Sequence, residues 1–494
     1  MAPELQKRTL AVESGFDASQ FDDDGRVKRT GIDTLLIHFL LDTTMLINKR
    51  TLLTASAHII TAVIGSGVLS LAWALAQLGW IAGPIALIAF SIITWFTSAL
   101  LADSYRSPFN GTRNYTYREA VKNNLGGIKY KFCALAQYVN LVGITIGYTI
   151  TASISMAAVK RSNCFHKNGH EAGCHTSNNM FMTIFGVTQI ILSQIPNFHE
   201  LSALSIMAAI MSFAYSLIGL GLSLAQIAGG NTGKTSLSGV VVGVDVTSSE
   251  KLWGSLQAIG NIAFAYAFST VLVEIQAIDP RFFLIQDQFC NDTLKSSPPE
   301  NREMKKATLI GVSITTIFYT LCGTLGYAAF GNNAPGNFLT GFGFYEPFWL
   351  IDFANICIVV HLVGAYQVFC QPIYNLVEEW CSRQWPESKF IKGFMFRLIW
   401  RTFYVIVTCV IAMLFPFFNS ILGLLGALSF WPLTVYFPIE MYISRSKIRR
   451  CSFVWTWLKV LSGTCLVVSL LAAAGSIEGL IKEVSAYKPF NSVS

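Results

Sequence analysis

The sequence predicts an all-α polytopic membrane protein with eleven transmembrane helices. Of its 494 residues 53% are hydrophobic and only 13% are charged, and the mean hydropathy is +0.50. A water-soluble chain of this length has no core that could bury so much apolar surface. Eleven apolar runs, each near or above the about 20 residues that cross a bilayer, occupy roughly residues 53–79, 80–101, 131–160, 179–197, 201–228, 252–276, 307–330, 347–378, 395–417, 419–442 and 453–481.

The distribution of positive charge predicts how these helices are oriented. If the N-terminus is cytoplasmic, the inward segments hold 27 of the 35 lysines and arginines, the outward segments hold seven, and Lys459 lies within the last run. Cytoplasmic segments of membrane proteins carry such an excess. We therefore expect the N-terminus inside and the C-terminus outside. The net charge of +7 is spread over alternate loops rather than gathered in one patch, which argues against a nucleic-acid partner.

The segments outside the runs divide the chain further. Residues 1–31 are polar and lack the apolar stretch of a signal peptide, so we expect a disordered cytoplasmic tail. Residues 32–50 are apolar but interrupted by Asp33 and Asp42, which suits an atypical interfacial segment better than a twelfth span. The transmembrane domain then covers 51–482, with a cytoplasmic loop at 277–306. A short extracellular tail, 483–494, ends the chain.

The first span contains a helix-weakening motif at membrane depth. Gly65, Ser66 and Gly67 follow Ile64, and two glycines allow the backbone to leave the helical hydrogen-bond ladder. Backbone groups freed inside a bilayer are tolerated only where they are buried in protein or line a cavity, where they can hold a ligand. The N-terminus of a half-helix would offer N–H donors and a favourable dipole to a carboxylate. Close packing of small residues against another helix is the alternative explanation.

The sixth span has a comparable irregularity. It carries the mid-span polar residue Asn261, followed by the small and aromatic residues Phe264, Ala265 and Tyr266. The first and sixth spans lead the two five-span halves of the chain. Interruptions at corresponding positions of two halves indicate an inverted-repeat transporter whose site lies at the midplane. We therefore predict a 5+5 inverted repeat with broken first and sixth helices.

Four titratable residues near the bilayer interior are candidates for proton coupling, because burying such groups unpaired is unfavourable. His361 lies near the middle of the eighth span, and an imidazole can change charge in the physiological range. It could equally be a neutral histidine bonded to a carbonyl. His58 precedes Gly65 by seven residues, about 10 Å along a helix. Glu274 and Asp352 lie nearer the ends of their spans, and Glu274 could simply be in contact with water.

Two cysteines share an outward loop. Cys164 and Cys174 are close in sequence, and a disulfide between them suits an oxidising exterior. His166, His170 and His175 lie nearby and leave a metal site open as an alternative, but the spacing matches no common zinc pattern. We favour the disulfide and expect no metal.

Several long motifs carry a family resemblance. The run 56–73 reads SAHIITAVIGSGVLSLAW, and it resembles the plant amino acid permeases of the amino acid/auxin permease family. Further matching segments are 105–107, 113–117, 146–155, 164–170, 194–198, 334–342 and 430–440. The resemblance covers the chain from about residue 50 to its end. It implies a leucine-transporter-type fold with eleven spans, a plasma-membrane location and proton-driven uptake of amino acids.

The chain also departs from the pattern of that family. Residues 32–49 and 277–291 resemble insertions, and a stretch present in relatives is missing near Gly393. Many relatives carry Asp where this chain has Asn261, a difference that could alter the preference among acidic, neutral and basic substrates.

We therefore expect symport of protons and amino acids into the cell by alternating access, with mainly neutral and also acidic substrates. The carboxylate would meet N–H groups at Gly65–Gly67, and the ammonium would face carbonyls near Phe264 and Ala265. Asn261 and Tyr266 would shape selectivity. Auxin or another small carboxylate as substrate, and a role as an amino acid sensing receptor, are the alternatives. No clustered catalytic array is visible, so we expect neither an enzyme nor a cofactor other than the coupling proton. The oligomeric state stays open.

Overall fold

The computed structural model describes most of the chain beyond residue 50. The described residues are 52, 55, 56, 59, 60, 63–108, 114, 116–169, 173–195, 202–270, 272–273, 300–343, 347–391 and 393–487. The predictions for residues 1–50, for residues 277–299 of the cytoplasmic loop and for residues 488–494 of the tail concern residues outside the described ranges. Those for His58 and Glu274 also lie outside the described residues.

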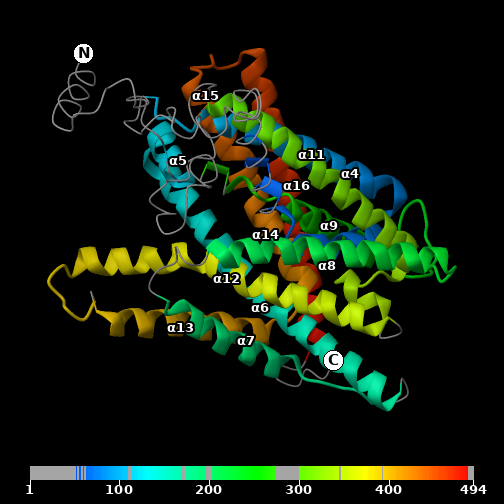
Figure 1. Cartoon of the computed structure of the whole chain (residues 1–494). Helices are drawn as coiled ribbons and strands as arrows, with labels where there is room; N and C mark the ends of the chain where they lie inside the picture. The colour runs from blue at the N-terminus through cyan, green and yellow to red at the C-terminus, as the bar shows by residue number, and fades with distance from the viewer. Residues whose placement is uncertain are drawn as a thin grey trace, which may run out of the picture.

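Helices make up the described architecture (Figure 1). Its α-helices are α4 (Leu71–Asp103), α5 (Tyr117–Leu125), α6 (Gly127–Asn168), α7 (Asn178–Ser193), α8 (Ser202–Ala228), α9 (Ser248–Ala265), α11 (Glu300–Phe330), α12 (Phe348–Gln384), α13 (Phe394–Leu414), α14 (Phe418–Ser429), α15 (Phe437–Arg445) and α16 (Phe453–Ala486). Short 3₁₀ helices occur at η2 (Ser66–Ser70), η5 (Gly331–Asn333) and η6 (Phe338–Phe342), and the π-helix η7 (Phe430–Tyr436) joins α14 to α15.

Each of the eleven apolar runs contains helical residues, and the prediction of an all-α polytopic membrane protein is confirmed. Within the described part, eight helical stretches are long and apolar enough to cross a membrane. The first of these, Ser66–Asp103, includes the end of the first run and all of the second. The two runs meet at Gly79, whose φ of 80° is a left-handed value that suits glycine. Helices α11 and α16 also extend beyond their runs, into the segments expected to be a loop and a tail.

Lipid-facing and buried surfaces alternate along these helices. On α4, the side chains of Ile81, Ile85, Ile88 and Ile92 are all about half exposed, at 49–62%. Their spacing places them on one face of the helix, as expected for a face in contact with lipid. The other side of the helix packs along α11.

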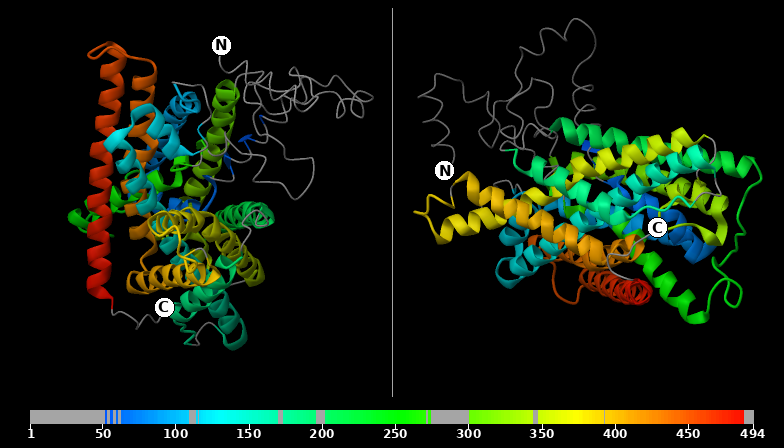
Figure 2. Two further views of the ribbon diagram at one scale, coloured as in Figure 1. Left: turned by 90° about the vertical axis from the view of Figure 1, so that its left-hand side faces the viewer. Right: turned by 90° about the horizontal axis from the view of Figure 1, so that it is seen from below.

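Two groups of helices organise the interior. Helices α6 and α8 pack against α12, while α9 packs against α14 and α16. Figure 2 shows α16 standing alongside α14 and α15, and it shows α12 and α13 running in opposite directions beyond the neighbouring helices. Because α9 also contacts α4 and η2, it lies between the first span and the α14–α16 pair.

Glycines bring the backbones of α9 and α14 into direct contact. A Cβ atom on Gly426 would lie 2.5 Å from Phe264 N and closer still to Gly260 O. A Cβ atom on Gly260 would in turn overlap with Gly423 O. Small residues permit this approach between membrane helices, where dispersion contacts rather than water exclusion hold the helices together. The position of α9 therefore depends on the absence of side chains at these three sites.

This contact yields a stability prediction. Gly426→Ala should lower the free energy of unfolding by about 1–3 kcal/mol, because the added methyl group overlaps with backbone atoms that cannot move aside. The apparent melting temperature of the detergent-solubilised protein measures this effect. Gly463→Ala on α16 is the matched control, since a Cβ atom there meets nothing within 4 Å. Equal melting temperatures for the two variants would contradict the close contact between α9 and α14.

Candidate functional site

The first span is interrupted at the Gly-Ser-Gly motif. Ile64 N still bonds to Ile60 O at 2.8 Å, as in a helix, but Gly65 has φ −140° and ψ −150°, which is extended backbone. The chain then forms η2 and enters α4 at Leu71. Gly65 is partly exposed, whereas the residues of η2 are buried. A helix that starts here leaves its first N–H groups without partners inside the helix.

The sixth span is interrupted four residues after Asn261. Helix α9 ends at Ala265, and Tyr266 has φ −97° and ψ 5°. Tight turns follow, in which Ala267 N bonds to Phe264 O at 3.1 Å and Phe268 N bonds to Tyr266 O at 3.0 Å. Helical residues resume at Ser269. The carbonyl end of α9 therefore lies at this break.

The two breaks touch each other. A Cβ atom on Gly67 would lie 2.9 Å from the Cα atom of Ala265 and 3.1 Å from its Cβ atom. Any side chain at position 67 would push the two segments apart. The close approach therefore requires glycine at position 67. It also requires a small side chain at position 265 of the other segment, which Ala265 provides.

Tyr319 of α11 connects the breaks through its hydroxyl group. The hydroxyl donates to Val63 O at 2.5 Å and lies 3.3 Å from Ala265 O. The ring of Tyr266 packs edge-on against that of Tyr319, with centroids 5.5 Å apart, and its hydroxyl lies 3.3 Å from Thr316 Oγ1. Backbone carbonyls at the ends of broken membrane helices need such partners. The single hydroxyl hydrogen of a fully buried tyrosine on a third helix lies within reach of both segments.

Sequence reasoning missed Tyr319 and Thr316. They are polar residues inside an apolar run, three positions apart, and so lie on one face of α11. That pattern shows that α11 has a polar face but does not reveal which carbonyls it contacts.

His361 of α12 lies beside the first break. Its side chain is 6% exposed, and Nδ1 lies 2.7 Å from Ala208 O of α8. A carbonyl can only accept, so Nδ1 carries the hydrogen and Nε2 of the neutral ring is an acceptor. Nε2 has no hydrogen-bond partner among the described residues, and it lies 3.8 Å from the position that a Cβ atom on Gly65 would occupy. One ring nitrogen therefore bonds a carbonyl, as in the alternative explanation of His361, and the other faces the break. Proton coupling by this ring stays a prediction.

The remaining predicted residues are distributed more widely. Asn261 is fully buried on α9, and its Oδ1 would lie 2.8 Å from a Cβ atom on Gly423. Among the described residues, neither amide atom of Asn261 has a hydrogen-bond partner. Asp352 accepts a hydrogen bond of 3.1 Å from Asn163 Nδ2 near the end of α6. It precedes His361 by nine residues, about 13 Å along a helix, so the two groups are not neighbours.

Cys164 and Cys174 form a disulfide with their Cα atoms 5.9 Å apart. The bond joins the last turns of α6 to the loop that leads into α7. In the same turns, the ring of His166 stacks on Phe348 at the start of α12, with centroids 3.9 Å apart. These contacts hold one end of α6 and lie apart from the two breaks.

Comparisons with known proteins agree with this architecture. A family described as "Transmembrane amino acid transporter protein" matches residues 48–482. Amino acid permease 6 of Arabidopsis thaliana is 60% identical over 510 aligned positions, covering 98% of this chain and 99% of the relative. Amino acid permease 1 of the same plant is 59% identical and covers 96% and 94%.

Among solved structures, the crystal structure of MhsT in complex with L-phenylalanine superposes with a TM-score of 0.50 at 10% sequence identity. The match covers 86% of this chain and 98% of MhsT. At this identity the similarity concerns the fold, and the prediction of a leucine-transporter-type fold is confirmed.

The tyrosine bridge makes a testable prediction. Tyr319→Phe should destabilise the protein by about 1 kcal/mol, the typical net contribution of one hydrogen bond. It should also increase hydrogen–deuterium exchange in peptides that span both breaks, because both carbonyls depend on the lost hydroxyl.

Tyr366→Phe is the matched control for this measurement. It removes a buried hydroxyl that bonds Thr408 Oγ1 at 3.0 Å, between α12 and α13. We expect a similar loss of stability without faster exchange at the breaks. If Tyr319→Phe accelerated exchange at neither break, the hydroxyl would not be what holds the two segments.

Proposed function

The chain belongs to the transmembrane amino acid transporter family, and from that premise we propose that it is a proton-coupled symporter that moves amino acids into the cell by alternating access. That it is an amino acid permease and a multi-pass membrane protein follows from its relatives. The observation that carries the finer proposal is that two helix breaks meet beside His361 Nε2, a nitrogen without a hydrogen-bond partner in the described part of the chain.

The substrate carboxylate is proposed to bind at the start of η2. Gly65, Ser66 and Gly67 would present main-chain N–H groups, and the positive end of the helix dipole would favour a negative charge. Ile64, the fourth residue expected at this site, would line it without donating, because its N–H bonds to Ile60 O. The partial exposure of Gly65 supports this placement. So does the space beside it, because a Cβ atom on Gly65 would meet only His361 Nε2 among the described residues.

The substrate ammonium is proposed to lie at the other break. The carbonyl end of α9, around Phe264 and Ala265, carries the negative end of a helix dipole, which favours a cation. The contact between Gly67 and Ala265 keeps the two helix ends within reach of one small zwitterion. We propose that Asn261 and Tyr266 shape selectivity, since both are buried on or next to the last turn of α9.

Coupling to protons is assigned to His361. A proton on Nε2 would place a positive charge next to the break that is proposed to hold the carboxylate. The charged ring would neutralise the bound carboxylate while the transporter changes conformation, so that the proton and the amino acid would cross together and acid would raise the maximal current. Asp352 lies near the start of α12, where it accepts a hydrogen bond from Asn163, and has no comparable position beside a break.

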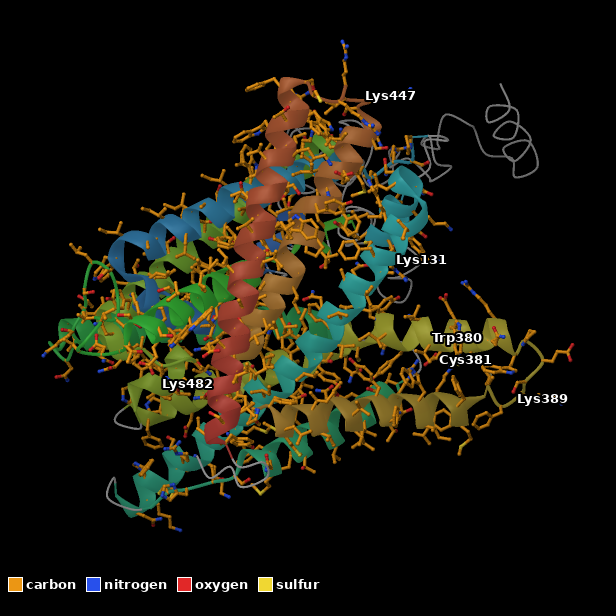
Figure 3. The ribbon with its side chains drawn as sticks, turned by 180° about the vertical axis from the view of Figure 1, so that it is seen from behind. Lys131, Trp380, Cys381, Lys389, Lys447 and Lys482 are labelled. Atoms are coloured by element: carbon orange, nitrogen blue, oxygen red, sulfur yellow. A yellow bond between two sulfur atoms is a disulfide. The ribbon has the colours of Figure 1, made fainter. Side chains whose placement is uncertain are left out.

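The proposed orientation places the N-terminus in the cytoplasm and the C-terminus outside, in the plasma membrane. Lys447 and Lys482 lie near opposite ends of α16 (Figure 3), as an inward and an outward lysine should. Lys131 and Lys389, two of the 27 positive residues expected on the inner side, lie on the opposite side of the molecule from Lys482 in that view. The distribution of lysines therefore supports the orientation derived from the loop charges.

Substitution of Gly65 tests the carboxylate site. In yeast deficient in amino acid uptake, the unmodified protein should restore growth on individual amino acids. Gly65→Val should abolish saturable uptake, because its methyl groups would fill the space before His361 Nε2. Gly65→Ala should raise the KM about ten-fold, equivalent to about 1.4 kcal/mol. Normal uptake by the valine variant, at equal amounts in the membrane, would refute the site. Growth restored only by auxin or another non-amino carboxylate would favour that substrate instead.

Substitution of His361 tests the coupling. His361→Phe and His361→Asn should both lose the rise in maximal substrate-evoked current that external acid produces, since neither residue can bind a proton. The asparagine variant retains a donor for Ala208 O and so separates titration from folding. Two-electrode recording at several external pH values measures the effect. Acid stimulation that persisted undiminished in both variants would remove His361 from the coupling role.

A further inference from the structure

A cavity of about 380 Å³ opens near the end of α16 that carries Lys482. It lies between the first span, the segment around η6 and the beginning of α14, on the side proposed to face the exterior. Glu483 is the one charged residue among its lining residues. The polar or aromatic side chains that share the lining with it are Trp73, Asn337, Thr340, Phe417, Phe418 and Asn419.

Glu483 is linked to α9 through a short hydrogen-bond chain. Ser420 Oγ donates to Glu483 Oε2 at 2.5 Å, and Gln257 Nε2 donates to Ser420 Oγ at 3.1 Å. The three residues belong to α16, α14 and α9. Ser420 and Gln257 are 1% and 6% exposed, so the chain runs from the cavity into the protein interior. Gln257 precedes the break at Ala265 by eight residues, about 12 Å along α9.

Gly479 of α16 lies next to these hydrogen-bonded side chains, and its lack of a side chain leaves space for them. A Cβ atom on Gly479 would lie 2.6 Å from Gln257 Oε1 and 3.1 Å from Ser420 Oγ. The carbonyl oxygen of the Gln257 amide therefore lies on the same side as the serine hydroxyl. The amide nitrogen of Gln257 bonds to Ser420 Oγ, and a rotation of the amide would turn its oxygen toward the same hydroxyl group.

No cation contacts Glu483 among the described residues. On the same elements, Lys482 pairs with Glu250 of α9, and Lys251 bonds to the carbonyls of Gln77 and Ser238. Glu478, one turn earlier on α16, is exposed. The other neighbouring titratable group, Tyr487, donates its hydroxyl hydrogen to Met413 O at 3.2 Å. An ionised carboxylate at this place has hydroxyl support but no opposite charge, a situation that is unfavourable near lipid unless a proton can be taken up.

The two charge states of Glu483 require different hydrogen bonds. An ionised carboxylate only accepts, so Ser420 donates to it across the 2.5 Å contact. A protonated carboxyl group can instead donate to Ser420 Oγ, which frees the serine hydrogen for Gln257 Oε1. Protonation would therefore reverse the direction of the chain and change how α9 is held against α14 and α16.

We propose that Glu483 binds a proton from the outer cavity and transmits its charge state through Ser420 and Gln257 to α9, as a second titratable site distinct from His361. The step transfers one proton from water in the cavity to the carboxylate and changes no other covalent bond. The proposal rests on the proton-coupled function proposed above. It assigns to Glu483 the dependence of substrate affinity on external acidity, whereas His361 governs the maximal current.

The test compares the KM for a neutral amino acid at external pH values of about 5 and about 8. Glu483→Gln should fix the KM at the acid value of the unmodified protein, because the amide mimics the protonated carboxyl group. Its maximal current should stay within about two-fold. Ser420→Ala should also make the KM independent of pH, since the link to α9 is cut. Glu478→Gln, an exposed carboxylate on the same helix, should behave like the unmodified protein.

Each other outcome contradicts the proposal. The proposal would be overturned if the KM of Glu483→Gln still changed with pH. If that variant fails to reach the membrane, a KM of Ser420→Ala that still changes with pH would overturn the proposal instead. Loss of uptake of cationic amino acids alone, with the pH dependence intact, would make Glu483 a substrate contact instead. If neither the KM nor the maximal current of the unmodified protein changed with external pH, the proton coupling itself would be refuted, and this inference with it. Retained pH dependence in both variants refutes the inference alone.

Discussion

The contact between Gly67 and Ala265, bridged by the hydroxyl of Tyr319, is the constraint on which the rest of the structure depends. Non-helical backbone can exist at membrane depth only where protein groups satisfy its polar atoms. Here two interruptions satisfy that requirement jointly, through one tyrosine of α11. Separating the segments would leave the carbonyls of Val63 and Ala265 with one partner fewer. Each break therefore stabilises the other.

Helix α9 connects this contact to other parts of the protein. At one end its last turn touches η2, and along its length glycines bring it against α14. Near its middle Gln257 joins it to Ser420 and Glu483. His361 approaches the first break from the opposite group of helices, through α12 and its bond to Ala208 of α8. A hydrogen bond of this kind contributes about 1 kcal/mol, so such links can be exchanged during a transport cycle without unfolding the protein.

Much of the fold could be predicted from local patterns. Apolar runs of bilayer length located the helices, and Gly65, Ser66 and Gly67 located the first break, because the conformational freedom of glycine is a property of the residue itself. The break at Ala265 was indicated less directly, by a polar residue and small side chains in an apolar run. The cysteine pair could be predicted because its spacing is short.

The partners of these groups could not be predicted from the sequence. Nothing near Tyr319 in sequence indicates that its hydroxyl reaches carbonyls more than 50 residues away on two other segments. The direction in which His361 Nε2 points depends on how α12 packs on α8, and the pairing of Asp352 with Asn163 depends on the length of α6. Glu483 was assigned to a tail because the apolar run ends before it, yet α16 continues to Ala486 and brings the carboxylate against Ser420. Such contacts arise from tertiary packing, which periodicity does not encode.

The central claim is that one amino acid binds between the paired helix ends, and a cryo-electron microscopy map with bound substrate tests it most directly. The account predicts density whose carboxylate lies within hydrogen-bond distance of N–H groups of residues 65–67 and whose ammonium lies at the carbonyl end of α9. Substrate density found only elsewhere, with Gly67 and Ala265 still in contact and the space beside His361 empty, would contradict it.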